Sequence, residues 1–265
     1  MKKLATKNPP QFSELHYYDS ARQEKWRIPV LYHDEALIAC NKPSGLPVIP
    51  ERWHPDWPCL RSIATDRLNL PLFVVHRLDA GTSGIVVFAK TASAHRELCR
   101  QFAQHQVEKT YLALVKGEVS EDTITIQRAL APNPQRPGVM MIARNGKPSA
   151  TTIRVLERFR GVSLVEAKPQ TGRQHQIRVH LQVVGHPLLV DPIYGQNETF
   201  FLSTIKNAFH LKKGETEQPL IRRLTLHASS LRFHHPERQE FMTLTAPEAK
   251  DFTTVVRNLR KYAAR

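Results

Sequence analysis

Cysteine is scarce in this chain: the 265 residues contain three, Cys40, Cys59 and Cys99, with no CxxC spacing. An odd number of widely spaced cysteines argues against a disulfide framework and against a structural zinc site, and it is typical of proteins in the reducing cytoplasm. No apolar run approaches the length of a membrane span, and the basic start of the chain leads into no apolar segment. We therefore expect a cytoplasmic protein with no signal peptide and no membrane span.

Several motifs that mark cofactor chemistry are also missing. The sequence contains no Walker A loop, no GxGxxG and no HExxH, so it supports no nucleotide cofactor and no metal site. His175 and His180 are five residues apart, which does not place both on one helix face at metal-binding spacing. Gly81–Gly84 does not form a GxSxG elbow, which leaves a serine hydrolase without support. We expect no cofactor and no metal.

Acidic residues are outnumbered by basic ones, 24 against 38, which gives a net charge of +14 and a pI near 10. Such an excess favours a polyanionic partner, usually nucleic acid and less often an anionic membrane surface. The excess is uneven, because ten Lys and Arg stand against two Glu between Gln127 and His180. A solvated basic face is the simpler interpretation, but this concentration favours a phosphate-binding surface.

The periodicity of the chain predicts more strands than helices. Strands are expected over residues 37–40, 73–75, 85–88, 109–117, 152–156, 162–167, 224–231 and 241–245. Helices are expected over 92–105, capped by Thr91, over about four turns from a Thr171–Gln174 capping box, and over 247–262. Residues 131–149 are expected to form a long basic loop, and 196–223 a polar, basic insertion with a surface helix. Few helical crossovers join the strands, so the pattern predicts an α+β fold with a mostly antiparallel sheet.

The most informative segment is His76-Arg77-Leu78-Asp79-Ala80-Gly81-Thr82-Ser83-Gly84, which lies between two short apolar runs. The two glycines allow a sharp connection between the strands, so Asp79 is expected at a rigid sheet edge beside two basic side chains. Asp in a turn commonly bonds only its own backbone, and this is the simplest interpretation of an isolated Asp79.

Residues 76–90, HRLDAGTSGIVVFAK, resemble the signature of the RluA-type RNA pseudouridine synthases. Four further segments resemble the same family in the same order: Asn41–Leu46, Lys168–Leu181, Asp191–Gly195 and Leu226–Ala228. The resemblance implies a bent, mostly antiparallel mixed sheet with flanking helices and an active-site cleft between two lobes. It also implies a cofactor-free isomerisation of uridine to pseudouridine in structured RNA, either rRNA or tRNA.

The resemblance assigns roles to single residues. Asp79 matches the essential aspartate, acting as nucleophile or base; Arg173 matches the arginine that pairs with it; and Tyr111 matches the tyrosine that packs on the target base. Substrate contacts are expected from a further set: His76, Arg77, Ile177, Arg178 and Lys42. Periodicity alone would assign Tyr111 and Ile177 to the core.

The same resemblance suggests a domain plan. We expect an N-terminal extension over residues 1–30, with no room for the additional RNA-binding domain that several family members carry. A catalytic domain would follow over 31–246, with the basic insertion at 196–223, and a C-terminal helix over 247–265. A monomer is expected, because the sequence shows no exposed heptad pattern.

Two other functions remain open at this point. A non-catalytic RNA-binding protein with the same fold would use the basic surface equally well and would bind RNA without isomerising it. A hydrolase that uses Asp79 and histidines with a metal would lose activity to chelators. The family motifs favour the pseudouridine synthase over both.

Overall fold

The computed structural model describes residues 13–51, 54–212, 214–238 and 240–265. The chain forms two compact units. Unit 1 consists of Met1–Glu108 and Ser229–Pro247, and unit 2 of Lys109–Ala228 and Glu248–Arg265. The strand pairs described below are antiparallel and are accompanied by helices, so the predicted α+β class is confirmed.

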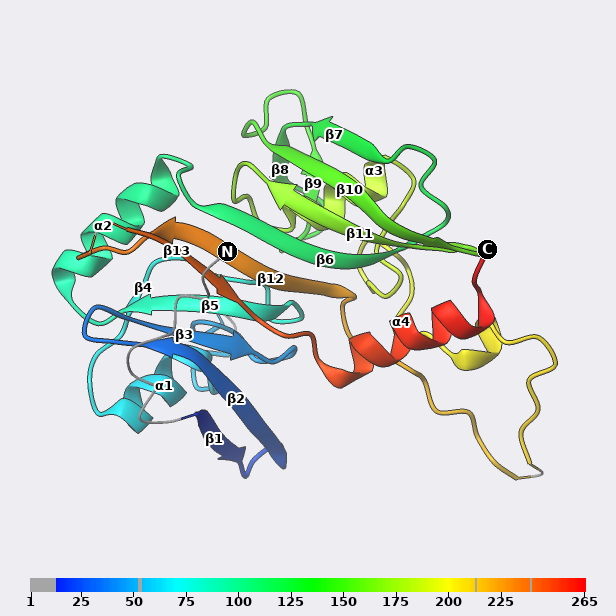
Figure 1. The fold of residues 1–265 in the computed structure, drawn as a ribbon, viewed down its shortest axis with the longest axis horizontal. Coiled ribbons are helices and arrows are strands. Elements are labelled where there is room, and N and C mark those ends of the chain that lie inside the picture. The colour runs from blue at the N-terminus through cyan, green and yellow to red at the C-terminus, as the bar shows by residue number, and fades with distance from the viewer. Residues whose placement is uncertain (1–12, 52–53, 213, 239) are drawn as a thin grey trace. The chain divides into compact units, whose positions relative to one another are not determined.

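Unit 1 is built on a sheet in which β1, β2, β3 and β5 follow one another, with β4 also paired to β5 (Figure 1). Its elements are β1 (Glu14–Asp19), β2 (Glu24–His33), β3 (Leu37–Lys42), α1 (Leu60–Leu68), β4 (Phe73–Val74), β5 (Ser83–Ala89), α2 (Ala92–Ala103) and β13 (Phe241–Thr245). Strand β12 (Leu226–His234) starts in unit 2 and ends in unit 1, where its residues from Ser230 onward pair with β13.

The predicted strands of unit 1 are confirmed, but one expectation was incomplete. All seven residues of β5 are buried, as expected of a β-branched apolar run covered on both faces. Strand β3 was expected to be the first strand, whereas β1 and β2 precede it and β2 pairs with it. Part of the extension expected over residues 1–30 therefore belongs to this sheet; residues 1–12 lie outside the described residues.

Helix α2 follows the predicted pattern. The Thr91 hydroxyl oxygen accepts a hydrogen bond from the backbone N–H of Ala94 at 3.1 Å, which satisfies a donor that the first turn leaves without an intrahelical partner. Ala94 and Leu98 are buried, and Phe102 is partly buried one turn further on. These three residues are spaced four apart and form one apolar stripe along the helix.

Unit 2 contains a sheet in the order β6, β11, β10, β7 (Figure 1), with a small separate sheet of β8 and β9. Its elements are β6 (Glu108–Lys116), β7 (Thr123–Gln127), β8 (Leu130–Pro132), β9 (Met140–Ile142), β10 (Ala150–Phe159), β11 (Val162–Pro169), α3 (Gln176–Val183), the 3₁₀ turn η1 (Leu202–Thr204) and α4 (Lys250–Tyr262). The predicted loop over 131–149 was wrong in part, because β8 and β9 form a hairpin there.

Alternate residues of β6 face opposite sides of the unit 2 sheet. Ala113 and Val115 are buried in one cluster with Ile177 of α3, and Tyr111 packs against that cluster. Leu114 is buried in another cluster with Phe252 of α4. Tyr111, Ala113 and Val115 therefore share one face of the strand, and α3 and α4 cover opposite faces of the sheet.

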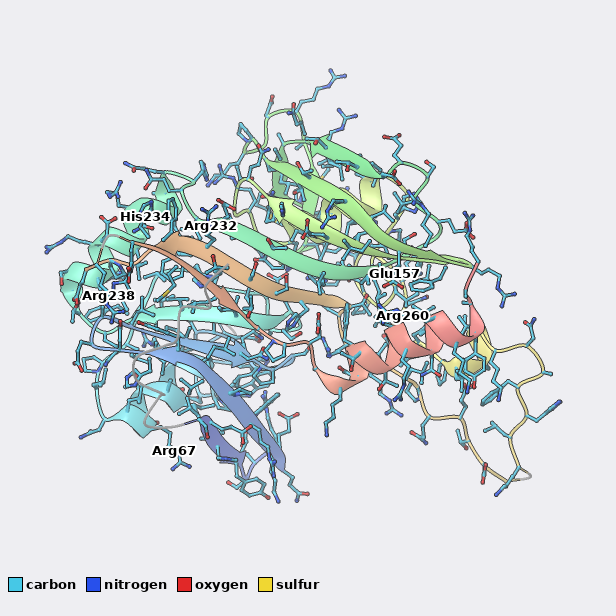
Figure 2. The ribbon with its side chains drawn as sticks, in the orientation of Figure 1. Arg67, Glu157, Arg232, His234, Arg238 and Arg260 are labelled. Carbon is cyan, nitrogen blue, oxygen red and sulfur yellow. The ribbon has the colours of Figure 1, made fainter. Side chains whose placement is uncertain are left out.

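Helix α4 packs through its apolar stripe and is tied down by ion pairs. Arg260 extends from α4 to Glu157 of β10 (Figure 2), with Nε donating to Oε2 at 2.9 Å. At the other end of the helix, both carboxylate oxygens of Asp251 accept hydrogen bonds from Arg223, at 2.6 and 2.7 Å. Arg223 belongs to the basic insertion, which is thereby connected to α4.

The surface helix expected in the insertion was wrong. Among the described residues between 196 and 223, η1 is the helical segment, and it spans three residues. Ala208 and Gly214 have positive φ, and neither conformation continues a right-handed helix. Phe200 is buried in the α4 cluster, so the insertion is anchored by packing. No helix of the described chain is long and apolar enough to cross a membrane.

Replacing Phe252 with alanine should lower the free energy of unfolding by about 3–5 kcal/mol, because the side chain is fully enclosed and its loss leaves a cavity. Chemical denaturation followed by circular dichroism measures this. Leu211→Ala, at an exposed position of the same unit, is the control and should stay within about 0.5 kcal/mol of wild type. Equal losses in the two variants would contradict the assigned core.

Candidate active site

Asp79 lies on the loop between β4 and β5, and the buried ammonium of Lys42 holds this loop by hydrogen bonds. The Lys42 side chain is 0% exposed, and its Nζ donates to the carbonyl oxygens of Pro43, Leu46 and Ala80 at 2.7–2.9 Å. A buried ammonium is stable only where its donors are satisfied, so these bonds fix the loop firmly. The substrate contact expected of Lys42 is not supported by this burial.

Two neighbours of Lys42 hold the same loop. The hydroxyl of Ser44 donates to the carbonyl of Gly81 at 2.6 Å, and the Gly45 N–H donates to the carbonyl of Ala80 at 2.8 Å. The segment Asn41–Leu46 therefore acts as a cradle for the backbone on the C-terminal side of Asp79. Asp79 itself is partly buried, so its carboxyl group is neither sealed in the core nor fully solvated.

The backbone geometry of the segment Asn41–Leu46 explains why it contains a glycine. Gly45 has a φ of +89°, a conformation that L side chains rarely adopt, and a Cβ there would lie 3.2 Å from the Trp26 ring. A side chain at this position would strain the backbone that bonds Ala80. Gly45 therefore helps to hold the Asp79 loop in place.

His76 and Arg77 differ in their surroundings. His76 Nε2 accepts a hydrogen bond from the Val87 N–H at 3.0 Å, and its ring stacks on Phe102 with centroids 4.8 Å apart. The His76 ring therefore accepts the hydrogen bond that a neighbouring strand would otherwise accept from β5, just beyond the end of β4. Arg77 is exposed, as a side chain that contacts a ligand from solvent would be.

Tyr111 belongs to unit 2 and stands on β6, opposite Ala167 of β11. Two residues earlier, Lys109 is largely buried, which lowers the pKa of its ammonium to about 8. Its Nζ donates to the Thr171 carbonyl at 3.2 Å. Lys109 therefore connects the start of β6 to the loop that carries Arg173.

The capping box predicted at Thr171–Gln174 was wrong. Helix α3 begins at Gln176 and spans eight residues, with His175 in the left-handed conformation at the N-cap. The Thr171 hydroxyl donates to the Gln176 side-chain oxygen at 2.7 Å, and the Arg173 N–H donates to the same oxygen at 3.0 Å. Arg173 thus precedes the helix on a tight loop, partly exposed, and its Nε donates to the Pro148 carbonyl at 3.3 Å.

Arg178 is the other motif arginine, and its environment differs from that of Arg173. It is 4% exposed, and its Nε and Nη2 donate to the two carboxylate oxygens of Asp191 at 2.7 and 2.9 Å. Burial by itself raises the pKa of Asp191, but the Arg178 guanidinium outweighs it and holds that pKa below the usual range. The ring of Tyr194 also lies 4.9 Å from the guanidinium carbon.

Polar side chains inside unit 2 lock α3 in place, and sequence analysis did not identify them. His180 is fully buried; its Nδ1 bonds Thr151 Oγ1 at 2.9 Å and its Nε2 lies 3.1 Å from both Ser149 Oγ and the Arg128 carbonyl. Burial lowers the pKa of His180, which keeps it neutral at pH 7. The available signal was its position one helical turn after Gln176.

Ile177 is 6% exposed and belongs to the core cluster that includes β6. Among the described residues, no group of three or more His, Cys, Asp or Glu side chains is arranged to hold a metal ion. The arrangement therefore offers a fixed carboxyl group in unit 1 and, in unit 2, a tyrosine and two arginines of contrasting burial.

Arg178→Gln should lower the free energy of unfolding by about 3–5 kcal/mol, because it leaves the Asp191 carboxylate buried without its cation. Chemical denaturation at pH 7 measures the change. Arg154→Gln is the matched control: Arg154 pairs with Glu166 at 3.2 Å but is largely solvated, so the expected loss is below about 1 kcal/mol. A similar loss in both variants would refute the buried pair.

The lowered pKa of Lys109 predicts a pH dependence. Between its folded pKa of about 8 and its ordinary value of 10.5, the unfolded chain binds more protons than the folded chain, so this group makes stability rise with pH over that window. The difference in unfolding free energy between wild type and Lys109→Met should therefore grow in favour of wild type from pH 7.5 to 9.5. Tyr32 and Cys40 also have raised pKa values, but both residues are present in wild type and variant, so their contributions to the pH dependence cancel in this difference. A pH-independent difference would contradict the burial of this ammonium.

Comparison with known proteins places these features in a family. The family model described as RNA pseudouridylate synthase matches residues 36–183. Ribosomal large subunit pseudouridine synthase C of Haemophilus ducreyi is 37% identical over 242 residues, covering 87% of this chain and 69% of that protein. Ribosomal large subunit pseudouridine synthase D of Nitrosomonas europaea is 34% identical over 247 residues, covering 91% and 68%.

A solved structure agrees with these sequences. Human RNA Pseudouridylate Synthase Domain Containing 1 superimposes with a TM-score of 0.65 at 26% identity, covering 90% of this chain and 96% of that one. The family match covers more than half of the chain, and it includes Asp79, Tyr111, Arg173 and Arg178. The resemblance stated from the sequence is thereby confirmed, and this chain belongs to the RNA pseudouridine synthases, the enzymes that isomerise uridine to pseudouridine in RNA.

Proposed function

We propose that this chain isomerises uridine in the RNA of the large ribosomal subunit, with Asp79 as the catalytic residue and without a cofactor. The names of the relatives, ribosomal large subunit pseudouridine synthases C and D, support this RNA ahead of tRNA. The observation that carries the proposal is the Asp79 loop. Asp79 is partly buried, and the backbone that follows it is held by the ammonium of Lys42 and the hydroxyl of Ser44.

The reaction needs only acid–base or nucleophilic chemistry. The bond from ribose C1′ to N1 of the base breaks, the base turns, and a bond from C1′ to C5 forms; C5 loses a proton and N1 gains one. Atoms and electrons balance without an oxidant or a co-substrate. Asp79 acts on the nucleoside either as nucleophile or as base. A rigid loop serves both roles, because small errors in position at the reacting atoms are costly.

The other site residues take supporting roles in this proposal. Tyr111 packs on the target base, and Ile177 provides apolar surface for it. Arg173 matches the arginine that the family pairs with the catalytic aspartate. Arg77 contacts the RNA or fills the place of the displaced base. The target uridine must leave its stack first, which is easiest in loops.

Two of the predicted contacts are better proposed as positioning residues. The burial of Lys42 supports a role in holding the Asp79 loop rather than in touching RNA. The hydrogen bond from Val87 to His76 supports the same for His76. Arg178 was also expected to contact the substrate, but its guanidinium is buried and oriented by Asp191 within unit 2.

We further propose that the protein acts as a monomer in the cytoplasm. The thiols of Cys40 and Cys59 are buried and free, as is usual in a reducing compartment. The catalytic region is proposed to span residues 31–246, with 196–223 as a basic insertion and 247–265 as the C-terminal helix.

Asp79→Asn should reduce tritium release from [5-³H]uridine-labelled ribosomal RNA by about a thousandfold or more, because the amide is neither a base nor an effective nucleophile. Asp56→Asn, at an exposed position of the same unit, should retain wild-type activity. Under the same conditions Arg173→Lys should lower kcat, because an ammonium does not reproduce the planar guanidinium that the family pairs with the aspartate. Wild-type release rates in Asp79→Asn would disprove the catalytic assignment.

A further inference from the structure

Unit 2 contains a groove that the proposed reaction does not use. Its volume is about 260 Å³, and its walls are the β8–β9 hairpin, the outer face of α3 and the Ile193–Tyr194 turn. Figure 1 shows β8, β9 and α3 close together in this unit, and α3 contacts β9. The residues that line the groove include none of those assigned above to the isomerisation.

The groove has an apolar floor and an open apolar edge. Met140, Ile142 and Ile193 pack on a buried cluster that contains Val179 and Tyr194. At the edge, Met141 and Val183 are 39% and 47% exposed, large values for side chains of this type. Both side chains line the groove, from β9 and α3, so its edge presents apolar surface to solvent.

The walls are held in fixed positions by hydrogen bonds. The Tyr194 hydroxyl accepts a hydrogen bond from the Met140 N–H at 2.8 Å and lies 2.8 Å from His175 Nδ1. The hairpin is therefore attached both to the turn after Asp191 and to the start of α3. A groove with fixed walls binds without the entropic cost of first ordering them.

The rim and its surroundings are basic and capable of hydrogen bonding. Residues 123–156, which include the hairpin, contain five basic side chains and no Asp or Glu. Arg136 on the rim is exposed, and Asn133 and Gln182 also line the groove. Arg, Asn and Gln side chains are those that read the edges of nucleobases, and basic groups contact the phosphates beside them.

We propose that this groove binds one unstacked nucleobase of the substrate RNA, distinct from the uridine that reacts. The inference rests on the proposed function insofar as RNA is the ligand. An apolar floor accepts the face of a base, the polar rim accepts its edge, and the absence of acidic residues fits the flanking phosphates. The volume lies below the roughly 300–1,000 Å³ of sites for drug-sized ligands, which favours a single planar ring.

The test uses two neutral substitutions in the full chain, Met141→Gln combined with Val183→Thr, which remove apolar surface without changing charge. Both side chains are exposed, so the fold should be retained, and thermal unfolding checks this. Leu211→Gln, 44% exposed and outside the groove, is the matched control. The measurements are equilibrium binding of a ³²P-labelled ribosomal RNA fragment and initial rates of isomerisation.

The double variant should weaken RNA binding and raise KM by about fivefold or more, with kcat unchanged, because base stacking on a side chain is lost. Arg136→Gln should also reduce the slope of log Kd against log salt by about one. Unchanged RNA binding in the double variant would overturn the proposal, as would a change confined to self-association in sedimentation. If wild type binds RNA but isomerises none, the proposed function fails, while a binding loss confined to the groove variants still supports the groove.

Discussion

The site in unit 1 depends on one buried positive charge. An ammonium taken out of water is costly unless its donors are satisfied, and Lys42 satisfies them on three backbone carbonyls. One of these belongs to Ala80, directly after Asp79. If the loop moved away, this ammonium would lose a hydrogen-bond acceptor, which costs free energy. The buried charge therefore restrains the loop that carries the catalytic carboxyl group. Asp79 itself is partly buried.

Unit 2 also depends on buried charge, but here a positive and a negative side chain form a buried pair. Arg178 and Asp191 are both nearly or fully buried, and each is stable because the other is present. The turn after Asp191 then brings Tyr194 to the start of α3 and to the β8–β9 hairpin. Neutral His180 and the amide of Gln176 hold the inner face of α3 to the start of β10. The loop with Arg173 and the groove beside the hairpin are both arranged around this helix.

Periodicity and capping predicted much of the fold because these signals are local. The β-branched run of β5, the alternation of β6 and the Thr91 cap of α2 each follow from a few neighbouring residues. The capping box at Thr171 failed because its side chain bonds a residue five positions on, which turns the chain tightly before α3 begins. Strands β1 and β2 were missed because polar and aromatic residues interrupt their apolar pattern, while their pairing with β3 supplies the stability.

The candidate site was predictable to the extent that motifs carry it. Asp79, Tyr111 and Arg173 came from resemblance, and the family is confirmed. The burial of Lys42 and of Arg178 was not predictable, because charged residues are ordinarily exposed and only the partners found in the fold reverse that preference. The groove was likewise invisible, since it forms from a hairpin, a helix face and a turn that are distant in the sequence.

The most direct measurement of the central claim is a map of pseudouridine across total RNA in cells. It compares a strain that lacks this gene with the same strain carrying either the wild-type chain or Asp79→Asn. If Asp79 catalyses the isomerisation, one or more pseudouridines in large-subunit ribosomal RNA disappear on deletion and return only with the wild-type chain. Return of those pseudouridines with Asp79→Asn would contradict it.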